Sequence, residues 1–389
     1  MAEYFAASTG SVSNDGLSEA TAGDLSTLFK ALLPGDKLWV KSDGVYTIDV
    51  LTDSNSRLSG DNIGTLDDPI VVEGYHQVPG DLEDQNIYDE NGVFINTENF
   101  PKIIFITSTN LAHTVIEAKA FWAIKFLDVE STERGKMTCV TDGTFYRVSI
   151  HFTGTCSYSQ AIEVGSRGNA LCCQGLFDMT SHPSTRGIGA IGSSSFHVCI
   201  VGCRVINLNE TNLLVSGITE NNGFGTFLNN LVVGAEEGYS YRRFDGVRSV
   251  FQNAAVSCDV GFAITGSGNN RVWTAGGNLA ADCGVGFSFG EDGNVHPTLV
   301  LNFAIGCTAP IEYVGTVNRY TEYYNKIAGI FVYGDMNDFF RDYPDSLTLK
   351  YDSLYTRKIN SMVPCTPLFP SPQKVAEAIW AREGRSLTG

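Results

Sequence analysis

An all-β solenoid, a rod made of stacked coils of chain, is the fold class that this 389-residue sequence predicts. Four segments align on an asparagine, with steps of 23, 25 and 24 residues between Asn230, Asn253, Asn278 and Asn302. Each segment carries a small residue or a cysteine at one place and an alternating apolar triplet at another. A fixed period of this length is typical of a solenoid in which every repeat forms one coil. A glycine content of 41 residues with only 18 % charged residues agrees with closely stacked, turn-rich coils.

The period also predicts how the chain is divided. At about 24 residues per coil and about 4.8 Å between neighbouring strands, residues 37–330 would form about twelve coils and a rod about 60 Å long. We therefore expect a parallel β-helix over residues 37–317. A cap precedes it in residues 1–36, an aromatic and acidic cap follows in residues 318–363, and residues 364–389 form a Pro-rich linker and a short attachment helix.

The two ends of the rod are predicted from different patterns. An open coil would expose core and strand edge, so a capping helix is expected at the N-terminal end. Asp24 can N-cap such a helix, whose apolar residues fall on one face, namely Leu25, Leu28, Phe29 and Leu32. Ten Tyr and Phe residues lie within residues 320–355, which suits a second cap but leaves an oligomer contact or a ligand face open.

Charge and cysteine usage limit the classes of function. Acidic residues exceed basic residues by 17, so no basic stripe is present to neutralise the phosphates of a nucleic acid. No apolar run reaches membrane-spanning length, and the first residues lack a secretory signal pattern, which predicts a protein made in the cytoplasm. Three of the ten cysteines, Cys258, Cys283 and Cys307, recur at one place of the repeat. We expect them to be free thiols stacked in the core.

The recurring asparagines are interpreted structurally. An asparagine at the same bend of successive coils can adopt the left-handed conformation and hydrogen-bond the asparagines above and below it. The sequence therefore predicts an asparagine ladder through Asn230, Asn253, Asn278 and Asn302.

The N-terminal part of the chain resembles pectate-lyase-like β-helix proteins. The resemblance lies in the strand and Gly-Ser-Asn-Asp-Gly loop of residues 4–18, in Pro-Gly-Asp at residues 34–36, in Gly-Val-Tyr at residues 44–46 and in the strand of residues 69–75. It implies a right-handed parallel β-helix. Lyases of this kind use a calcium-binding set of aspartates with an Arg or Lys base, whereas hydrolases use two or three aspartates.

No complete catalytic set of that kind is found in the repeat. Asp259 and Asp282, which follow and precede the core cysteine of their coils, could line one edge with Glu237, and these three are weak catalytic candidates. Solvent-facing turn residues are the alternative. The six histidines show no paired metal-ligand spacing, so neither a metal nor a cofactor is predicted.

A denser group of polar and aromatic residues follows the apolar triplets. Two turns could form a mixed-charge ridge that contacts a neighbouring subunit or an acidic sugar. The predicted ligand or interface residues are Tyr241, Arg242, Arg243, Asp245, Glu291 and Asp292.

The C-terminal segment resembles a short motif of tailed-bacteriophage structural proteins, Val-Ala-Glu-Ala-Ile-Trp followed by Arg-Ser-Leu-Thr. The resemblance implies attachment through Val375, Ile379, Trp380, Arg382, Arg385 and Leu387. We therefore expect a virion structural protein, tailspike-like or head-decorating, that forms a homotrimer, contacts other virion proteins and possible host polysaccharide, and inserts into no membrane. The alternatives are a polysaccharide lyase or glycoside hydrolase acting along the β-helix, and a carbohydrate-binding protein without catalysis.

Overall fold

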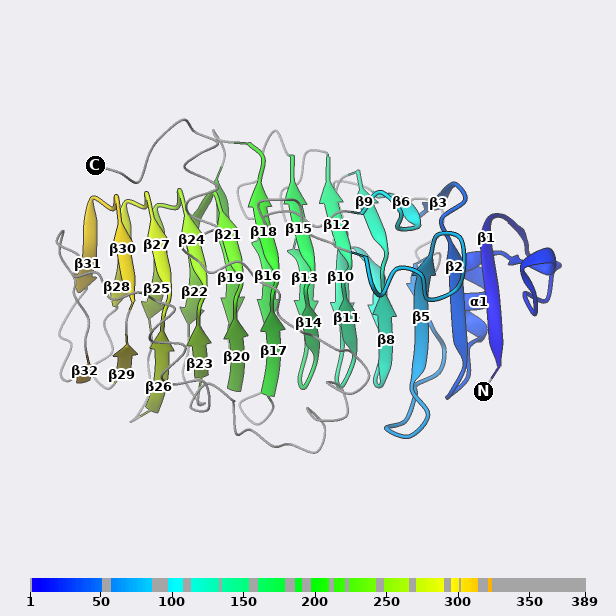
Figure 1. Ribbon diagram of the computed structural model, residues 1–389, viewed down its shortest axis with the longest axis horizontal. Coiled ribbons are helices and arrows are strands. Elements are labelled where there is room, and N and C mark those ends of the chain that lie inside the picture. Colours follow the sequence, from blue (N-terminus) through cyan, green and yellow to red (C-terminus); the bar gives the residue numbers. More distant parts are fainter. Residues whose placement is uncertain are drawn as a thin grey trace.

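The protein forms a parallel β-helix in the computed structural model, with three sheets running along a single rod (Figure 1). Strands of neighbouring coils pair in parallel throughout the described residues, and nearly every coil contributes one strand to each sheet. The structure describes residues 2–50, 57–85, 97–107, 113–132, 135–153, 160–178, 186–190, 197–209, 213–220, 224–242, 248–265, 271–289, 295–300, 302–313 and 321–323.

The three sheets are named A, B and C in the order in which a coil visits them. Sheet A contains twelve strands among the described residues, namely β1 (Glu3–Ser11), β2 (Lys37–Lys41), β5 (Ile70–Tyr75), β8 (Trp122–Lys125), β11 (Thr144–Tyr146), β14 (Asn169–Leu171), β17 (His197–Val201), β20 (Phe224–Leu228), β23 (Arg248–Phe251), β26 (Arg271–Gly276), β29 (Val295–Val300) and β32 (Thr321–Tyr323). Sheet B contains β3 (Val45–Asp49), β6 (Lys102–Ile106), β9 (Asp128–Ser131), β12 (Ser149–Phe152), β15 (Gln174–Phe177), β18 (Arg204–Asn207), β21 (Leu231–Val233), β24 (Ala254–Val256), β27 (Leu279–Ala281) and β30 (Phe303–Ile305). Sheet C contains β4 (Leu58–Ser59), β7 (His113–Ala118), β10 (Gly135–Cys139), β13 (Gln160–Val164), β16 (Arg186–Ala190), β19 (Leu214–Glu220), β22 (Ala235–Arg242), β25 (Val260–Thr265), β28 (Val285–Phe289) and β31 (Ala309–Tyr313).

The corners between sheets are set by single residues in the left-handed conformation. Between sheets A and B, positive φ angles recur in successive coils, for example at Asn229 (58°), Gln252 (55°) and Gly277 (62°). Between sheets B and C they recur at Ser257 and Asp282, both 52°. A left-handed residue reverses the direction of the chain within one or two positions, so each corner stays short and the next strand stacks on its equivalent in the coil before.

The core is filled by the inward residue of each strand, stacked on its equivalents. Tyr239, Phe262 and Phe287 pair in register, and their rings stack with centroid distances of 4.6 and 4.9 Å. The cysteines behave as predicted, because Cys258 and Cys283 are buried free thiols and Cys307 is a half-buried one. Side chains of the same kind therefore stack on one another in successive coils, which is the origin of the sequence repeat.

The predicted asparagine ladder is present. All four side chains are buried, and each Nδ2 donates to the Oδ1 of the next asparagine, at 2.9 Å for Asn230 to Asn253, 3.1 Å for Asn253 to Asn278 and 2.8 Å for Asn278 to Asn302. The expected left-handed conformation was assigned one position too far along the chain. It belongs to the residue before each asparagine, such as Gln252 or Gly277. The asparagine itself lies at the start of sheet B, and its side-chain amide points along the rod axis.

The N-terminal cap contains the predicted helix, α1 (Leu25–Ala31), and a short 3-10 helix, η1 (Glu19–Thr21). Asp24 caps α1, because its Oδ2 accepts a hydrogen bond from the backbone N–H of Thr27 at 2.9 Å. The face that carries Leu25, Leu28 and Phe29 is buried against the first coils. Helix α1 therefore covers the apolar end of the rod, as its pattern predicted (Figure 1).

Replacing the capping residue should loosen this end of the rod. For Asp24→Ala we expect the free energy of unfolding to fall by about 1 kcal/mol, because the first turn of α1 loses the acceptor of a backbone N–H. Urea unfolding followed by circular dichroism measures the change. Asp24→Asn, which keeps an acceptor oxygen at the same place, is the matched control and should lose much less. Equal losses in the two variants would contradict the capping role.

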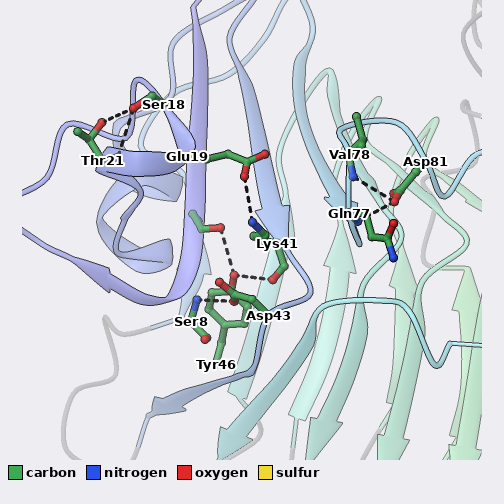
Figure 2. A network of polar contacts seen from close by, with 11 residues as sticks. Ser8, Ser18, Glu19, Thr21, Lys41, Asp43, Tyr46, Gln77, Val78 and Asp81 are labelled. Atoms are coloured by element: carbon green, nitrogen blue, oxygen red, sulfur yellow. Dashed lines mark hydrogen bonds and ion pairs between the residues drawn. The ribbon is translucent and has the colours of Figure 1, made fainter.

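Polar contacts join the cap to the first coils (Figure 2). The backbone N–H of Ser8 donates to Oδ1 of Asp43 at 2.9 Å, and the hydroxyl of Tyr46 reaches the carbonyl oxygens of Lys41 and Ala6 at 2.8 and 3.2 Å. The Nζ of Lys41 lies 2.9 Å from Oε2 of Glu19. Burial raises the pKa of Tyr46 well above its usual range. These contacts hold β1 and the cap loop to β2 and β3.

The described parts of the acidic segment after β5 pack onto the rod. Leu82 in this segment and Phe100 just after it are buried against Phe126 and Tyr146 on the outside of the coils. Asp81 holds the turn before it, because its carboxylate accepts the backbone N–H groups of residues 76–78 (Figure 2). Partial burial acts to raise the pKa of Asp81, and those three hydrogen bonds outweigh it and lower the pKa.

Candidate functional site

The three weak catalytic candidates lie around sheet C but do not form one row. Glu237 pairs with Ser216 and Val260 in the strand register and is half-buried. Asp259 is exposed just before β25, and its equivalent in the next coil is Gly284. Asp282 is a left-handed corner residue whose equivalent in the previous coil is Ser257. The two aspartates therefore occupy different positions of the coil, on opposite sides of the cysteine column.

The predicted ligand or interface group is only partly described. Tyr241 is 1 % exposed, with its ring 5.3 Å from that of Phe227 inside the rod. It is thus a core residue and not a surface contact, because it shares the inward position of Ile264 and Phe289. Arg242 is the last residue of β22. The other members lie outside the described residues, as do all the predicted attachment residues, namely Arg243, Asp245, Glu291, Asp292, Val375, Ile379, Trp380, Arg382, Arg385 and Leu387.

The outward face of sheet B changes character along the rod. In the coils of β18 to β27 it is apolar and buried, with Ile206, Leu231, Val256 and Leu279. In the coils of β6 to β12 it is polar and ionisable. These outward residues alternate with inward core residues, for example Val129 between Asp128 and Glu130.

We name the polar part of this face the acid–base cluster, and it consists of Lys102, Asp128, Glu130, Ser149 and His151. Strand register brings its members together. Asp128 of β9 pairs with Lys102 of β6 on one side and with Ser149 of β12 on the other. Glu130, two residues further along the same face, pairs with His151. Three successive coils thus place two carboxyl groups, an imidazole and an ammonium group on one surface.

The carboxyl group of Asp128 is tuned to hold a proton near neutral pH. Burial raises the pKa of Asp128 to about 6, with a further contribution from the negative charge of Glu130. Lys102 and a hydrogen bond with Ser149 act in the opposite direction without cancelling the effect of burial. A carboxylic acid with a pKa in this range can donate a proton to a leaving group at mildly acidic pH.

The pKa of the His151 imidazole is shifted in the opposite direction. Burial lowers its pKa, and this effect outweighs the attraction of Glu130 and Asp178 for the protonated ring. Its buried Nε2 has no hydrogen-bond partner among the described residues. Burial therefore favours the neutral form of His151, and a neutral ring nitrogen can accept a proton from water.

Glu130 and Lys102 form the fixed charges of the cluster. The Nζ of Lys102 lies 2.9 Å from Oε2 of Glu130, and this carboxylate raises the pKa of Lys102 through that hydrogen bond. Glu130 is thus held in an ion pair with Lys102. Asp128 and His151 are diagonal neighbours on adjacent parallel strands, which places their Cα atoms about 8 Å apart. Such a spacing leaves room for a reacting bond and a water molecule between acid and base.

The other outward faces carry ionic groups that serve packing. On sheet A, buried Glu73 accepts Lys37 at 3.0 Å and Lys125 at 3.2 Å. On sheet C, Lys136 pairs with Glu163, and the hydroxyl of Ser59 donates to Glu117. No cluster of three potential metal-ligating side chains and no helix long and apolar enough to span a membrane occurs within the described ranges. The acid–base cluster is therefore the chemically distinct group among these faces.

The sequence analysis did not single out the acid–base cluster. A usable signal was present, because Asp128 to Ser149 and Glu130 to His151 are both separated by 21 residues, which is one coil. The repeat was aligned only from about residue 228, where the inward residues are most alike. The 21-residue step is shorter than the steps of 23–25 residues in the repeat, so the strand register was needed to show that these polar residues share one face.

Comparisons with known proteins agree with this fold. No protein-family model matches the chain, and no curated protein sequence matches it. Among solved structures it is similar to the pectate lyase Pel9A, with 15 % identity over 82 % of this chain and 78 % of that chain and a TM-score of 0.50. A rhamnogalacturonan lyase follows with 12 % identity, coverage of 79 % and 74 % and a TM-score of 0.46. An alginate lyase from Paenibacillus sp. str. FPU-7 has 12 % identity, coverage of 82 % and 99 % and a TM-score of 0.48.

The chain is thus a right-handed parallel β-helix protein of the pectate-lyase-like architecture. At these identities the likeness concerns the fold alone, so the chemistry must be argued from the chain's own residues.

Proposed function

We propose that the protein cleaves a neutral polysaccharide by acid–base hydrolysis at the acid–base cluster. One observation carries the proposal: Asp128, with a pKa raised to about 6, shares a surface with His151, whose pKa is lowered. Burial that raises the pKa of a carboxyl group and lowers the pKa of a neighbouring imidazole favours a protonated acid beside a neutral base. The likeness of the rod to a pectate lyase makes polysaccharides the first substrate class to test.

In the proposed reaction, Asp128 donates its proton to the glycosidic oxygen as the bond to the anomeric carbon breaks. His151 accepts a proton from a water molecule, whose oxygen bonds to the anomeric carbon. Glu130, held by Lys102, keeps a negative charge beside the site that favours the positive charge developing on the sugar ring and on the imidazole. Water attacks from the side opposite to the acid, so inversion at the anomeric carbon is expected.

The charge around the cluster favours a neutral sugar over a uronate. Glu130 and Asp178 both act on His151, and Lys102 is already paired with Glu130. A polyuronate would bring its carboxylates towards these negative charges without an unpaired cation to receive them. Hydrolysis is therefore favoured over elimination, which requires neutralisation of the uronate carboxylate.

The direct test is incubation of the protein with a panel of neutral and acidic polysaccharides. New reducing ends without the absorbance of unsaturated uronate would support hydrolysis, and their appearance from neutral glycans alone would support the substrate class. Unsaturated products would replace the proposal with the lyase alternative. Absence of any product across a broad panel would remove both and leave binding without catalysis.

The pH dependence of cleavage follows from the two pKa shifts. Asp128 must be protonated, so the rate should fall as the pH rises through about 6. His151 must be neutral, so the rate should also fall below its lowered pKa. We expect a bell-shaped profile of kcat/KM with its maximum at mildly acidic pH, measured from initial rates of reducing-end formation. A maximum at alkaline pH would contradict these roles.

The virion role remains a separate prediction. Its motif and its attachment residues lie outside the described part of the chain, and the expected homotrimer and virion location rest on that resemblance. A polysaccharide hydrolase carried on a virion would have both the proposed activity and the predicted location. Neither of the two depends on the other.

A further inference from the structure

The net charge of the chain is concentrated at the N-terminal end of the rod. Residues 1–100 contain 18 of the 43 acidic residues but only 4 of the 26 basic residues. Fourteen of the 17 excess negative charges therefore belong to the first 100 residues, and the remainder of the chain is close to neutral. Such an asymmetry gives one end of an elongated molecule a strong negative potential.

The same end carries most of the exposed apolar side chains. Among the described residues, seven of the eight large exposed apolar side chains lie before residue 79, and the exception is Leu208. Three of the seven come from two neighbouring segments: Leu33 is 55 % exposed, Ile63 59 % and Leu66 37 %. Single exposed apolar residues are ordinary, but a group on one surface marks a contact site.

Backbone contacts hold these two segments side by side. Nδ2 of Asn62 donates to the carbonyl oxygen of Leu32 at 2.8 Å, and the N–H of Gly35 donates to the carbonyl oxygen of Asp68 at 3.0 Å. The turn at Leu33 is fixed by buried Asp36, whose Oδ2 accepts the N–H of Leu33 at 3.0 Å. The loop of residues 60–69 therefore lies against the C-terminal end of α1, and its apolar side chains are presented by an ordered backbone.

Exposed acidic side chains lie on the loop that carries two of these apolar residues. Asp61, Asp67 and Asp68 are all exposed on the same loop as Ile63 and Leu66. We define the apolar–acidic patch by its six residues, Leu33, Asp61, Ile63, Leu66, Asp67 and Asp68.

From this arrangement we propose that the apolar–acidic patch is a docking site for a partner protein that presents a cationic, amphipathic segment. Leucine-like side chains of the partner would cover Leu33, Ile63 and Leu66, while its Lys or Arg residues face the three aspartates. The proposal is independent of the proposed hydrolase, because the patch and the acid–base cluster share no residue.

The negative charge of the apolar–acidic patch favours a cationic protein segment over the other possible occupants. A second copy would bring the same acidic end against this one, and the like charges would repel. An anionic lipid surface would be repelled in the same way. A cationic protein segment is attracted over a distance of about 8–10 Å at physiological salt and then gains the burial of the apolar group.

The test uses the full-length protein and a fluorescently labelled amphipathic peptide of leucine and lysine as the probe. Its Kd is measured by anisotropy at low and high salt, beside a leucine–glutamate peptide and a serine–lysine peptide of the same length. The triple variant Leu33→Ser, Ile63→Ser, Leu66→Ser is compared with Leu208→Ser, a matched exposed apolar residue elsewhere on the rod that is 46 % exposed. A second variant, Asp61→Asn with Asp68→Asn, removes charge without removing apolar surface.

We expect the leucine–lysine peptide to bind the wild type, the triple variant to bind at least about tenfold more weakly, and Leu208→Ser to bind within about twofold of the wild type. The aspartate variant should weaken binding and flatten its salt dependence. Equal affinity of the triple variant and Leu208→Ser, or equal affinity for the leucine–glutamate peptide, would overturn the proposal. Self-association of the wild type that the triple variant abolishes, seen by sedimentation, would assign the patch to a second copy instead.

Discussion

Asp128→Asn should abolish the cleavage of polysaccharide. Asparagine has nearly the shape of aspartic acid but has no proton to give to the leaving oxygen, so kcat/KM should fall by about 10²–10⁴. The loss should be smaller for substrates with a good leaving group, which need little protonation. The measurement is the initial rate of reducing-end formation near the pH maximum. Asp84→Asn, the same change at an exposed aspartate away from the acid–base cluster, is the matched control.

Asp128→Asn should lower the activity but raise the stability of the protein. A stability measurement therefore shows whether the inactive variant is folded. The pKa of Asp128 is raised in the folded state, so folding favours its protonated form. Between its unfolded pKa, about 3.9, and its folded pKa, about 6, the folded state binds more protons, and stability falls as the pH rises. Above pH 6 the charged, partly buried carboxylate destabilises the folded state. Asp128→Asn should therefore have a higher Tm than the wild type at pH 8 but not at pH 4. Retained activity, or a lower Tm at pH 8, would show that Asp128 is not the buried acid proposed.

The sequence predicted the fold because stacking forces equivalent residues to be alike. The side-chain amides of Asn253 and Asn278 can hydrogen-bond from coil to coil only if each coil supplies the same group. The rings of Tyr239 and Phe262 stack at an interplanar angle of 4°, which requires flat side chains at that position in consecutive coils. These are inward or corner positions, so their repetition is visible in the sequence. The capping helix was likewise predictable from the spacing of its apolar face.

The candidate site was not predictable in the same way. Outward residues such as Asp128 and His151 are not constrained by stacking, so they do not recur from coil to coil. Coil length also varies in this half of the rod: the corner residue recurs after 21 residues from Phe126 to Arg147, but after 30 from Cys172 to Gly202. Without the register, the spacing alone could not show which polar residues share a face. Nor could it show that burial raises the pKa of Asp128 and lowers the pKa of His151.

The ladder that reveals the fold should also be one of its main sources of stability. For Asn278→Ala we expect the free energy of unfolding to fall by about 3 kcal/mol, because several buried groups lose partners at once. Oδ1 of Asn278 accepts the backbone N–H of Asn253 at 3.0 Å and its Nδ2 at 3.1 Å. Nδ2 of Asn278 donates to the carbonyl oxygen of Val250 at 2.9 Å and to Oδ1 of Asn302 at 2.8 Å.

The matched comparison for the ladder is Asp259→Ala, a change of similar size at an exposed position near a corner of the preceding coil. It removes no buried partner, so its effect on unfolding should stay within about 0.5 kcal/mol. Urea midpoints of the two variants beside the wild type decide the question, and unchanged stability of Asn278→Ala would remove the ladder as a stabilising element. The effect is large because Asn253 donates both its backbone N–H and one hydrogen of its Nδ2 to the single oxygen of Asn278. Loss of that oxygen therefore leaves donors unpaired in the preceding coil as well as in the coil of Asn278.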